Sequence, residues 1–283
     1  MTKTLHSGLL GRAILASRSA WLHEQEARAQ GLELTYELFD FDARGLSDAQ
    51  LAPMIAALRD RGYCGFNVTY PFKQSIIPLL DELADSATLV GAVNTVAIRG
   101  GRMTGHNTDF SGFAESVREG LAGASLERVL QFGAGGAGSA VASALLSLGT
   151  QVLRLFDLDA SRSRALIAAL RARFPDRDIG IAEDVAATVS GVDGLVNATP
   201  LGMAAYPGSP LEEALLVPRL WVADIVYFPL ETALLRAARQ RGCRVMNGSR
   251  MVIGQAALAF EIITGHSADI ERMRESFFAS PTS

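Results

Sequence analysis

The chain contains almost no lysine. Only Lys3 and Lys73 of its 26 basic residues are lysines, so arginine supplies nearly every positive charge. A desolvated amine can lose its proton near neutral pH, whereas a guanidinium effectively cannot. Lys73 is therefore a candidate for proton transfer, and the alternative is a chance survivor of a bias toward arginine.

Cysteine is also scarce, and no metal-ligand spacing is present. Cys64 and Cys243 form no CxxC pair, and His23 and His266 lie at no ligand spacing. A disulfide framework and a zinc site are therefore not expected. We expect both thiols to be reduced and buried in a cytoplasmic protein.

The chain lacks excess positive charge and a long apolar run. Its net charge is −4 and its pI about 5.6, which argues against nucleic acid as a partner. Arg12 and Arg18 interrupt the first 21 residues, which therefore contain no apolar region long enough for a signal peptide. The uncharged segment 129–153 holds five glycines, so we predict strand, turn, helix and strand rather than a membrane span.

A length of 283 residues and 49% hydrophobic content indicate two globular domains. Short apolar runs alternate with amphipathic stretches up to residue 96, including predicted helices over 46–60 and 71–89, which favours an open sheet. A second series of strands and helices is typical of a doubly wound parallel sheet. We predict a substrate domain of residues 1–105, completed by two helices within 248–283, and a nucleotide domain of residues 106–247. Only the tail 279–283 is expected to be disordered.

A glycine-rich turn lies between a predicted strand and a predicted helix. It contains Gly133, Gly135, Gly136 and Gly138, which permit close approach of a pyrophosphate to a helix N-terminus. The next strand ends in Asp157, whose carboxylate can bind both ribose hydroxyls and repel a 2′-phosphate. We therefore predict NAD as the cofactor, with some NADP use possible through Arg162 and Arg164. The alternative for Asp157 is a helix N-cap or turn residue.

Several polar clusters lie at predicted strand ends, and further motifs follow in the second half of the chain. They are Ser17-Arg18-Ser19, NVTYPFK at 67–73, GAVNTV at 91–96, GHNTDFSGF at 105–113, NATPLGM at 197–203, DIVYFPLETALL at 224–235 and GQAALAF at 254–260. This set of motifs, in this order, resembles the shikimate dehydrogenase family. The resemblance covers nearly the whole chain. It implies two α/β domains flanking a cleft, and reversible reduction of 3-dehydroshikimate to shikimate, with quinate accepted by some members.

The resemblance also implies a role for individual residues. Lys73 and Asp109 would be the catalytic pair, in which Lys73 exchanges the hydroxyl proton. Ser17, Ser19 and Tyr227 would bind the substrate carboxylate, while Thr69, Asn94 and Gln255 would bind ring hydroxyls. Asn197, Thr199 and Met203 would lie near the cofactor, and Gly248 near the nicotinamide.

Each of these residues has a structural alternative. Ser17, Ser19 and Asp109 could cap helices, Asn94 could be a turn residue, and Tyr227 and Gln255 could serve packing or lie on the surface. The chain also departs from the family pattern at four places, which are Asp157-Leu158-Asp159, Ala20, Tyr70 and Gly254. The first departure resembles the NAD-linked branch, and the others concern ring specificity.

The sequence therefore predicts an NAD-dependent dehydrogenase of a small cyclic hydroxy acid, with shikimate as the first candidate. Quinate and an aminoshikimate are alternative substrates, and a non-catalytic NAD-binding regulatory module is an alternative of another class. Family precedent allows a monomer or a homodimer. No membrane, nucleic-acid or metal partner is expected.

Overall fold

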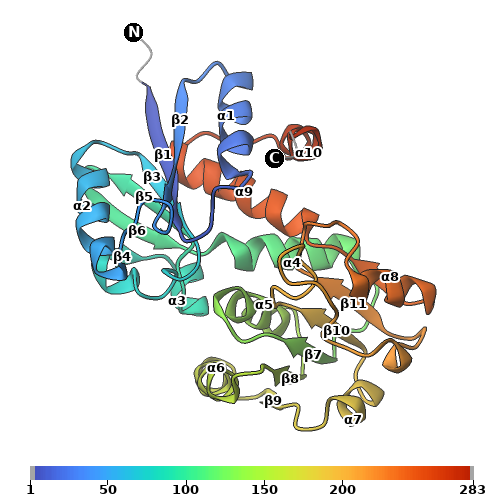
Figure 1. Ribbon diagram of the computed structural model, residues 1–283. Coiled ribbons are helices and arrows are strands. Elements are labelled where there is room, and N and C mark those ends of the chain that lie inside the picture. Colours follow the sequence, from blue (N-terminus) through green and yellow to red (C-terminus); the bar gives the residue numbers. More distant parts are fainter. Residues whose placement is uncertain (1–3, 281–283) are drawn as a thin grey trace. The chain divides into compact units, whose positions relative to one another are not determined.

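The structure is a computed structural model that describes residues 4–280 (Figure 1). The chain forms two compact units. One ends at Thr108 and resumes at Ile253, and the other comprises Asp109–Val252. The predicted limits of the inserted domain, 106 and 247, lie three and five residues from these boundaries. The tail predicted to be disordered begins inside the last helix, and residues 281–283 lie outside the described part.

The first unit contains a mixed six-stranded sheet in the order β2-β1-β3-β5-β6-β4. β1 pairs in parallel with β2 and β3, whereas β5 pairs antiparallel with β3 and β6. Its strands are β1 Leu5–Gly11, β2 Leu34–Asp40, β3 Gly65–Val68, β4 Glu82–Leu83, β5 Thr95–Arg99 and β6 Arg102–His106. The antiparallel pair β5 and β6 turns through Gly100 and Gly101, both at positive φ, where a glycine avoids strain.

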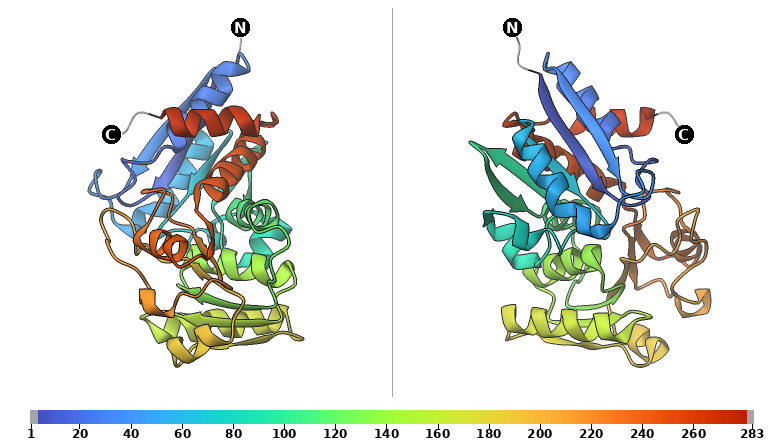
Figure 2. Two further views of the ribbon diagram at one scale, coloured as in Figure 1. Left: turned by 90° about the vertical axis from the view of Figure 1, so that its right-hand side faces the viewer. Right: turned by 60° about the vertical axis from the view of Figure 1, so that its left-hand side comes forward.

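Helices cover both faces of this sheet. α2 packs on one face, while α1 and the part of α9 that belongs to this unit lie on the other (Figures 1 and 2). α10 packs against α1. The helices are α1 Ser19–Ala29, α2 Leu51–Asp60, α3 Asp85–Val90, α9 Ser249–Thr264 and α10 Ile270–Ala279.

The helix predicted over 71–89 is wrong. A turn follows β3, and then come the short 3₁₀ helix Ile77–Leu79, β4 and α3. Pro78 lies in the 3₁₀ segment and lacks the N–H that an α-helix would need there. The apolar spacing of this segment reflects packing on the core of the first unit, not a continuous helix.

The second unit contains an all-parallel sheet in the order β12-β11-β10-β7-β8-β9, as predicted. Its strands are β7 Arg128–Phe132, β8 Val152–Phe156, β9 Asp178–Ile181, β10 Gly194–Asn197, β11 Trp221–Asp224 and β12 Arg244–Met246. The chain runs outward from β7 in one direction and then from β10 in the other. The switch between these two central strands is the place where such sheets bind ligands, at the carboxyl ends of the strands.

Apolar side chains pack on both faces of this second sheet. α4, α5 and α6 contribute to the cluster on one face, and α7 and α8 to the cluster on the other. Their bounds are α4 Thr108–Gly120, α5 Gly136–Ser147, α6 Ala160–Arg173, α7 Val185–Ser190 and α8 Ala233–Gln240. The segment 129–153 thus forms a strand, a turn, a helix and the start of a strand, as predicted.

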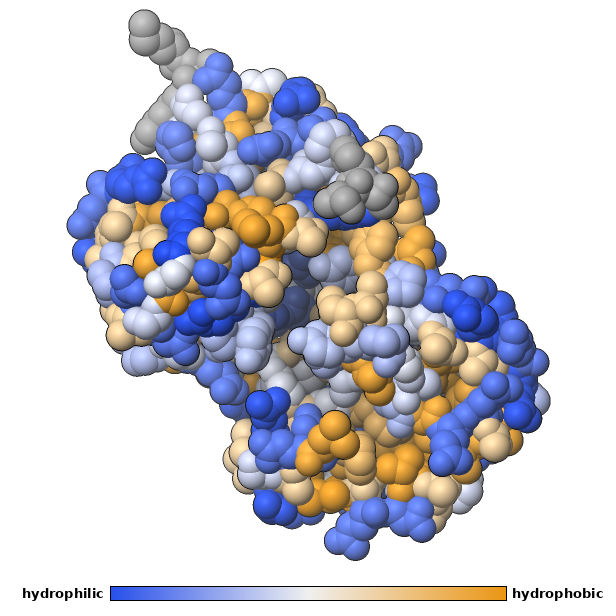
Figure 3. Space-filling view, viewed as in Figure 1, coloured by the Kyte–Doolittle hydropathy of each residue, from blue (hydrophilic) through white to orange (hydrophobic). Residues whose placement is uncertain are grey.

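The surface of each unit mixes hydrophilic and hydrophobic residues on the side seen in Figure 3. Within residues 4–280, no helix is long and apolar enough to cross a membrane. The same residues contain no group of three potential metal ligands. Neither Cys64 nor Cys243 forms a disulfide, and Cys243 is buried. The prediction of burial is wrong for Cys64, which is half-buried and is the residue directly before β3.

Candidate active site

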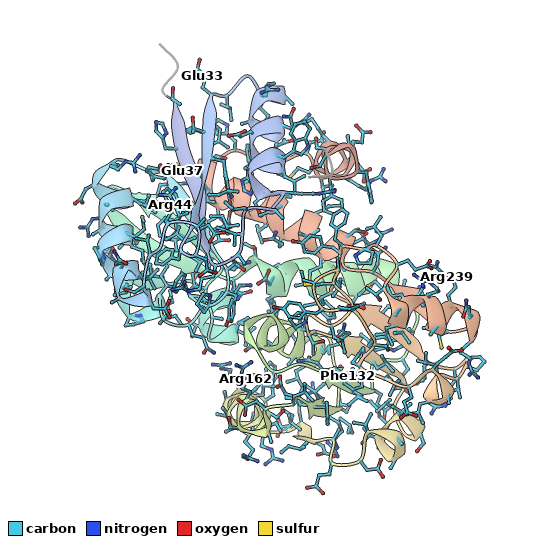
Figure 4. All side chains as sticks on the ribbon, in the orientation of Figure 1. Glu33, Glu37, Arg44, Phe132, Arg162 and Arg239 are labelled. Atoms are coloured by element: carbon cyan, nitrogen blue, oxygen red, sulfur yellow. The ribbon has the colours of Figure 1, made fainter. Side chains whose placement is uncertain are left out.

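The glycine-rich turn begins directly after Phe132, the last residue of β7 (Figure 4). Gly133 has φ +95°, and a Cβ there would lie 2.7 Å from Ala198 O. A Cβ on Gly138 would lie 2.3 Å from Gly133 O, so neither position accepts a larger residue without a shift. These two glycines let the turn, α5 and the end of β10 approach closely.

The N-terminus of α5 faces open space at the middle of this turn. Gly135 is the N-cap residue and makes no side-chain cap, and a Cβ on it would meet no atom within 4 Å. Gly136 is the first helical residue. Uncapped N–H groups and the positive end of a twelve-residue helix suit an anion. The residues present therefore fit the pyrophosphate of a dinucleotide.

Asp157 lies beside this turn at the end of β8. Its Oδ2 accepts a hydrogen bond from Ala134 N at 2.8 Å, and its Oδ1 accepts one from Asp159 N at 2.9 Å. The N-cap of α6 is Asp159, not Asp157. Arg162, on α6 (Figure 4), pairs with Asp159 at 3.5 Å. The Asp157 carboxylate is thus held next to the glycines, and each oxygen retains a lone pair for a ligand hydroxyl.

Asn197 organises the loop that follows β10. Its Oδ1 accepts from the N and Oγ1 of Thr199, at 3.1 and 2.6 Å. Its Nδ2 donates to Leu201 O at 2.8 Å and to Asp224 Oδ1 at 3.0 Å. Because the Asn197 side chain is fully buried and engaged, its influence on a cofactor is through the shape of this loop. Thr199 Oγ1 also accepts from Leu201 N at 3.1 Å.

The remaining predicted residues of the second unit differ in exposure. Met203 is exposed and lines a cavity of about 420 Å³ that loop 202–208 forms with Phe228 and the residues after it. Gly248 packs backbone to backbone, because a Cβ there would lie 2.2 Å from Ile225 O. Tyr227 is half-buried, and its ring lies edge-on to Phe228 with centroids 5.8 Å apart.

In the first unit, Ser17 and Ser19 adjoin each other at the start of α1. The Ser17 hydroxyl donates to Ser19 Oγ at 3.1 Å, and Ser17 Oγ accepts weakly from Ser19 N at 3.3 Å. The N-cap residue is Arg18, which makes no side-chain cap. The alternative of a Ser19 cap is therefore wrong, because Ser19 is already helical. Both hydroxyls are half-buried, within reach of a ligand.

Asn94 and Gln255 meet at Thr108. Asn94 Nδ2 donates to Thr108 Oγ1 at 2.9 Å, and Asn94 Oδ1 accepts from Thr108 N at 2.8 Å. The Thr108 hydroxyl also lies 3.3 Å from Gln255 Oε1. Asn94 is therefore more than a turn residue, and one of its two amide hydrogens remains for a ligand. Thr69 follows β3, and its N donates to Leu10 O at 2.9 Å.

Lys73 and Asp109 belong to different units. Lys73 is half-buried in the turn after β3, where its carbonyl accepts from Val93 N at 2.8 Å. Asp109 is buried in the first turn of α4 and is the first residue of the second unit. It lies within the helix and does not precede it, so it is not an N-cap. Their action as a pair stays a prediction.

Sequence reasoning missed five buried residues with polar groups beside these residues. The Tyr36 hydroxyl donates to Asn67 Oδ1 at 2.7 Å, and Asn67 Nδ2 donates to Thr95 Oγ1 at 3.0 Å. Burial raises the pKa of Tyr36, and a hydrogen bond with Ser19 acts in the opposite direction. Gln131 and Asp224 lie in the second unit. The available signal was a polar residue inside an otherwise apolar strand.

Comparisons with known proteins agree with this geometry. Residues 9–96 match the shikimate dehydrogenase substrate binding domain, and residues 248–276 match the shikimate 5′-dehydrogenase C-terminal domain. Shikimate dehydrogenase (NADP(+)) of Pseudarthrobacter chlorophenolicus is 48% identical over 98% of this chain and 95% of its own. The chain belongs to the shikimate dehydrogenase family. The resemblance inferred from the motifs is thereby confirmed.

Other members of the family differ in the cofactor that their names give. Quinate/shikimate dehydrogenase (NAD(+)) of Corynebacterium glutamicum strain R is 43% identical over 99% of this chain and 100% of its own. The solved quinate dehydrogenase from Corynebacterium glutamicum in complex with NAD has a TM-score of 0.92 and 43% identity, covering 98% of this chain and 99% of its own. Membership makes this protein an oxidoreductase of the shikimate/quinate type, acting on a CH–OH group with a nicotinamide cofactor. The choice between NAD and NADP is not decided by these likenesses.

Proposed function

We propose that this protein is an NAD-dependent dehydrogenase that oxidises a ring hydroxyl of shikimate reversibly. The observation that carries the proposal is the fixed carboxylate of Asp157 at the glycine-rich turn. A carboxylate there accepts hydrogen bonds from ribose hydroxyls and repels a 2′-phosphate. Relatives named for NADP and for NAD have similar identity to this chain, so Asp157 is the better guide to the cofactor.

Residues of the second unit would hold the cofactor. The N–H groups at the start of α5 would bind the pyrophosphate, Asp157 the adenosine ribose, and the loop shaped by Asn197 the nicotinamide half. The bound cofactor supplies the hydride acceptor at its nicotinamide ring. Arg162 is paired with Asp159, which reduces its availability to a 2′-phosphate.

Residues of the first unit would hold the acid. Ser17 and Ser19 present adjoining hydroxyl groups suited to a carboxylate, and the resemblance adds Tyr227 to them. Asn94, Gln255 and Thr69 would bind ring hydroxyls, because their groups can both donate and accept hydrogen bonds.

Lys73 would exchange the proton of the reacting hydroxyl. Alcohol oxidation requires a base within hydrogen-bond reach of that hydroxyl as hydride leaves the same carbon. Asp109 would orient the hydroxyl and contact its neighbour on the ring. Lys73→Ala should lower kcat by about 100-fold or more, whereas Gln74→Ala, an exposed neighbour in the same turn, should retain activity.

The deciding experiment measures reduced-cofactor formation with shikimate and quinate, each with NAD and NADP. We expect shikimate and NAD to give the highest kcat/KM. Asp157→Ser should raise the KM for NAD and lower that for NADP, with little change in the KM for the acid. Asp184→Ser is the matched control, because Asp184 lies in the same unit and caps α7 through a hydrogen bond from Ala187 N, not through the glycine-rich turn.

Each outcome of this experiment bears on one part of the proposal. A higher kcat/KM with quinate would replace shikimate by quinate as the proposed substrate. Quinate is the second candidate because this chain is similar to a solved quinate dehydrogenase. Unchanged NAD kinetics in Asp157→Ser would reject the cofactor assignment. Binding of NAD without turnover of either acid would reject the enzymatic role toward these acids.

A further inference from the structure

Gln131 is a polar residue in the centre of an apolar sheet. It lies on β7, whose neighbours are β8 and β10, and its side chain is completely buried. Leu130 and Phe132 pack in the cluster with α8, while Val129 packs in the cluster with α5. Because side chains alternate along a strand, Gln131 faces the α5 side with Val129.

The amide of Gln131 joins the two ends of the glycine-rich turn. Its Nε2 donates to Gly133 O at 2.8 Å and to Gly138 O at 2.9 Å. Both acceptors are carbonyls, which fixes which end of the amide is the nitrogen. A Cβ on Gly138 would lie 3.2 Å from Nε2, so the missing side chain at Gly138 makes room for this contact.

One peptide group of the turn is held from both sides. Gly133 O and Ala134 N–H belong to the same planar trans peptide and point in opposite directions. Gln131 donates to the oxygen, and Asp157 Oδ2 accepts from the N–H at 2.8 Å. Rotation of this peptide would therefore break both hydrogen bonds at once. The orientation of the turn and that of Asp157 are coupled through it.

The other end of the amide has no partner. Gln131 Oε1 is buried and makes no hydrogen bond within the described residues. An unpaired buried oxygen costs free energy that an apolar side chain of the same length would not incur. Folding of the sheet alone therefore does not account for a glutamine at this position, whereas a role in holding the turn does.

We propose that Gln131 is a positioning residue for the dinucleotide pyrophosphate and for Asp157. It draws the Gly133 and Gly138 carbonyls inward, away from the anion, and keeps the N–H groups at the start of α5 directed outward. This inference rests on the proposed dinucleotide site. It assigns a role in cofactor affinity to a side chain that touches neither the cofactor nor the acid.

The test compares Gln131→Met with the wild-type protein. The variant keeps the length of the side chain and removes both hydrogen bonds. We expect the KM for NAD and the Kd for ADP-ribose to rise about 10-fold, with kcat and the KM for the acid within about twofold. Gln151→Met is the matched control, because Gln151 donates to Gly149 O in the same unit, in the turn that precedes β8 and not in the turn that follows β7.

Gln131→Glu provides a second readout that a purely structural role would not change. Once ionised, its carboxylate would face two carbonyl oxygens with no proton to donate. The KM for NAD should therefore rise with pH in this variant, more steeply than in the wild-type protein and in Gln131→Met. This arm remains informative if Gln131→Met folds poorly.

The outcomes separate this inference from the proposed function. Wild-type affinity for NAD in Gln131→Met, or no added pH dependence in Gln131→Glu, would overturn the inference. A parallel rise in the KM for the acid would also overturn it, because that pattern indicates general loosening. Failure of the wild-type protein to bind ADP-ribose would instead overturn the proposed dinucleotide site.

Discussion

Asp224 is a buried carboxylate whose titration should control the stability of the second unit. It ends β11, is 1% exposed, and accepts hydrogen bonds from Asn197 Nδ2 at 3.0 Å, Val226 N at 3.0 Å and Thr232 Oγ1 at 2.7 Å. None of these partners is a cation. Burial raises the pKa of Asp224 from 3.8 to about 6, although the three hydrogen bonds act in the opposite direction.

The direction of the pH effect follows from where the proton binds. In the unfolded chain the carboxyl ionises near 3.8, and in the folded protein it ionises near 6. Between these values the folded state holds more protons than the unfolded state, so stability falls as pH rises. The raised pKa corresponds to about 3 kcal/mol of destabilisation at neutral pH relative to the fully protonated form.

Urea unfolding of the wild-type protein and Asp224→Asn from about pH 4 to pH 8 measures this effect. Asparagine retains an acceptor for Asn197 and Val226, and its Nδ2 can donate to Thr232 Oγ1. We expect the advantage of Asp224→Asn to widen by about 2 to 3 kcal/mol between about pH 4 and pH 7. Trp221 fluorescence in a Trp21→Phe background would report on the second unit.

Asp176→Asn is the matched control, because Asp176 is exposed in the same unit. Its unfolding free energy should follow that of the wild-type protein at every pH. A constant difference between Asp224→Asn and the wild-type protein would refute the reasoning, as would a difference that narrows as pH rises.

Two further predictions concern packing and the ion pair between buried Glu26 and half-buried Arg272. Gly138→Ala should raise the Kd for NAD at least about 10-fold, because its Cβ would lie 2.3 Å from Gly133 O. The Cβ of Gly135→Ala would have no atom within 4 Å, so this variant should retain the fold. Titration calorimetry measures the Kd for NAD of both variants, and equal values would contradict the prediction. Glu26→Gln should cost about 1 to 3 kcal/mol in urea unfolding, because the buried Glu26 carboxylate accepts two hydrogen bonds from Arg272, which keeps only its longer pair with Asp269. The exposed Glu271→Gln should cost little. Burial alone would raise the pKa of Glu26, but its hydrogen bonds lower it. The stabilisation of the folded state by the Glu26 carboxylate is therefore complete above about pH 4.5 and is lost as pH falls. Equal losses of unfolding free energy in Glu26→Gln and Glu271→Gln would contradict this account.

The second unit was predictable because its strands are buried on both faces. Such strands are continuous apolar runs, and a glycine-rich turn marks the first of them. The first unit was harder, because β4 has only two residues and β5 and β6 form a short antiparallel hairpin. Pro78 interrupts a segment whose apolar spacing mimics a helix. Local spacing cannot reveal that tertiary packing, rather than helical periodicity, produced the pattern.

The candidate site was predictable where motifs carry it, as at Ser17, Asn94 and Asp157. The supporting residues were not, because each acts through a partner that only the fold brings near. Asp224 meets Asn197 from another strand, and Gln131 meets a turn two to seven residues away that must first fold back over it. From sequence, such residues are single polar interruptions of apolar strands.

The docking of α10 on α1 can form only after the last helix has been synthesised. Trp21 Nε1 donates to Ser276 O at 2.9 Å, and Arg18 donates to Phe277 O at 2.9 Å. All of the second unit, Asp109–Val252, lies between these partners in the chain. Because the ribosome delivers the chain from its N-terminus, the second unit can emerge and fold while α1 still lacks its cover. The side of α1 that contains Trp21 and Glu26 therefore stays uncovered for the time needed to translate more than half of the protein.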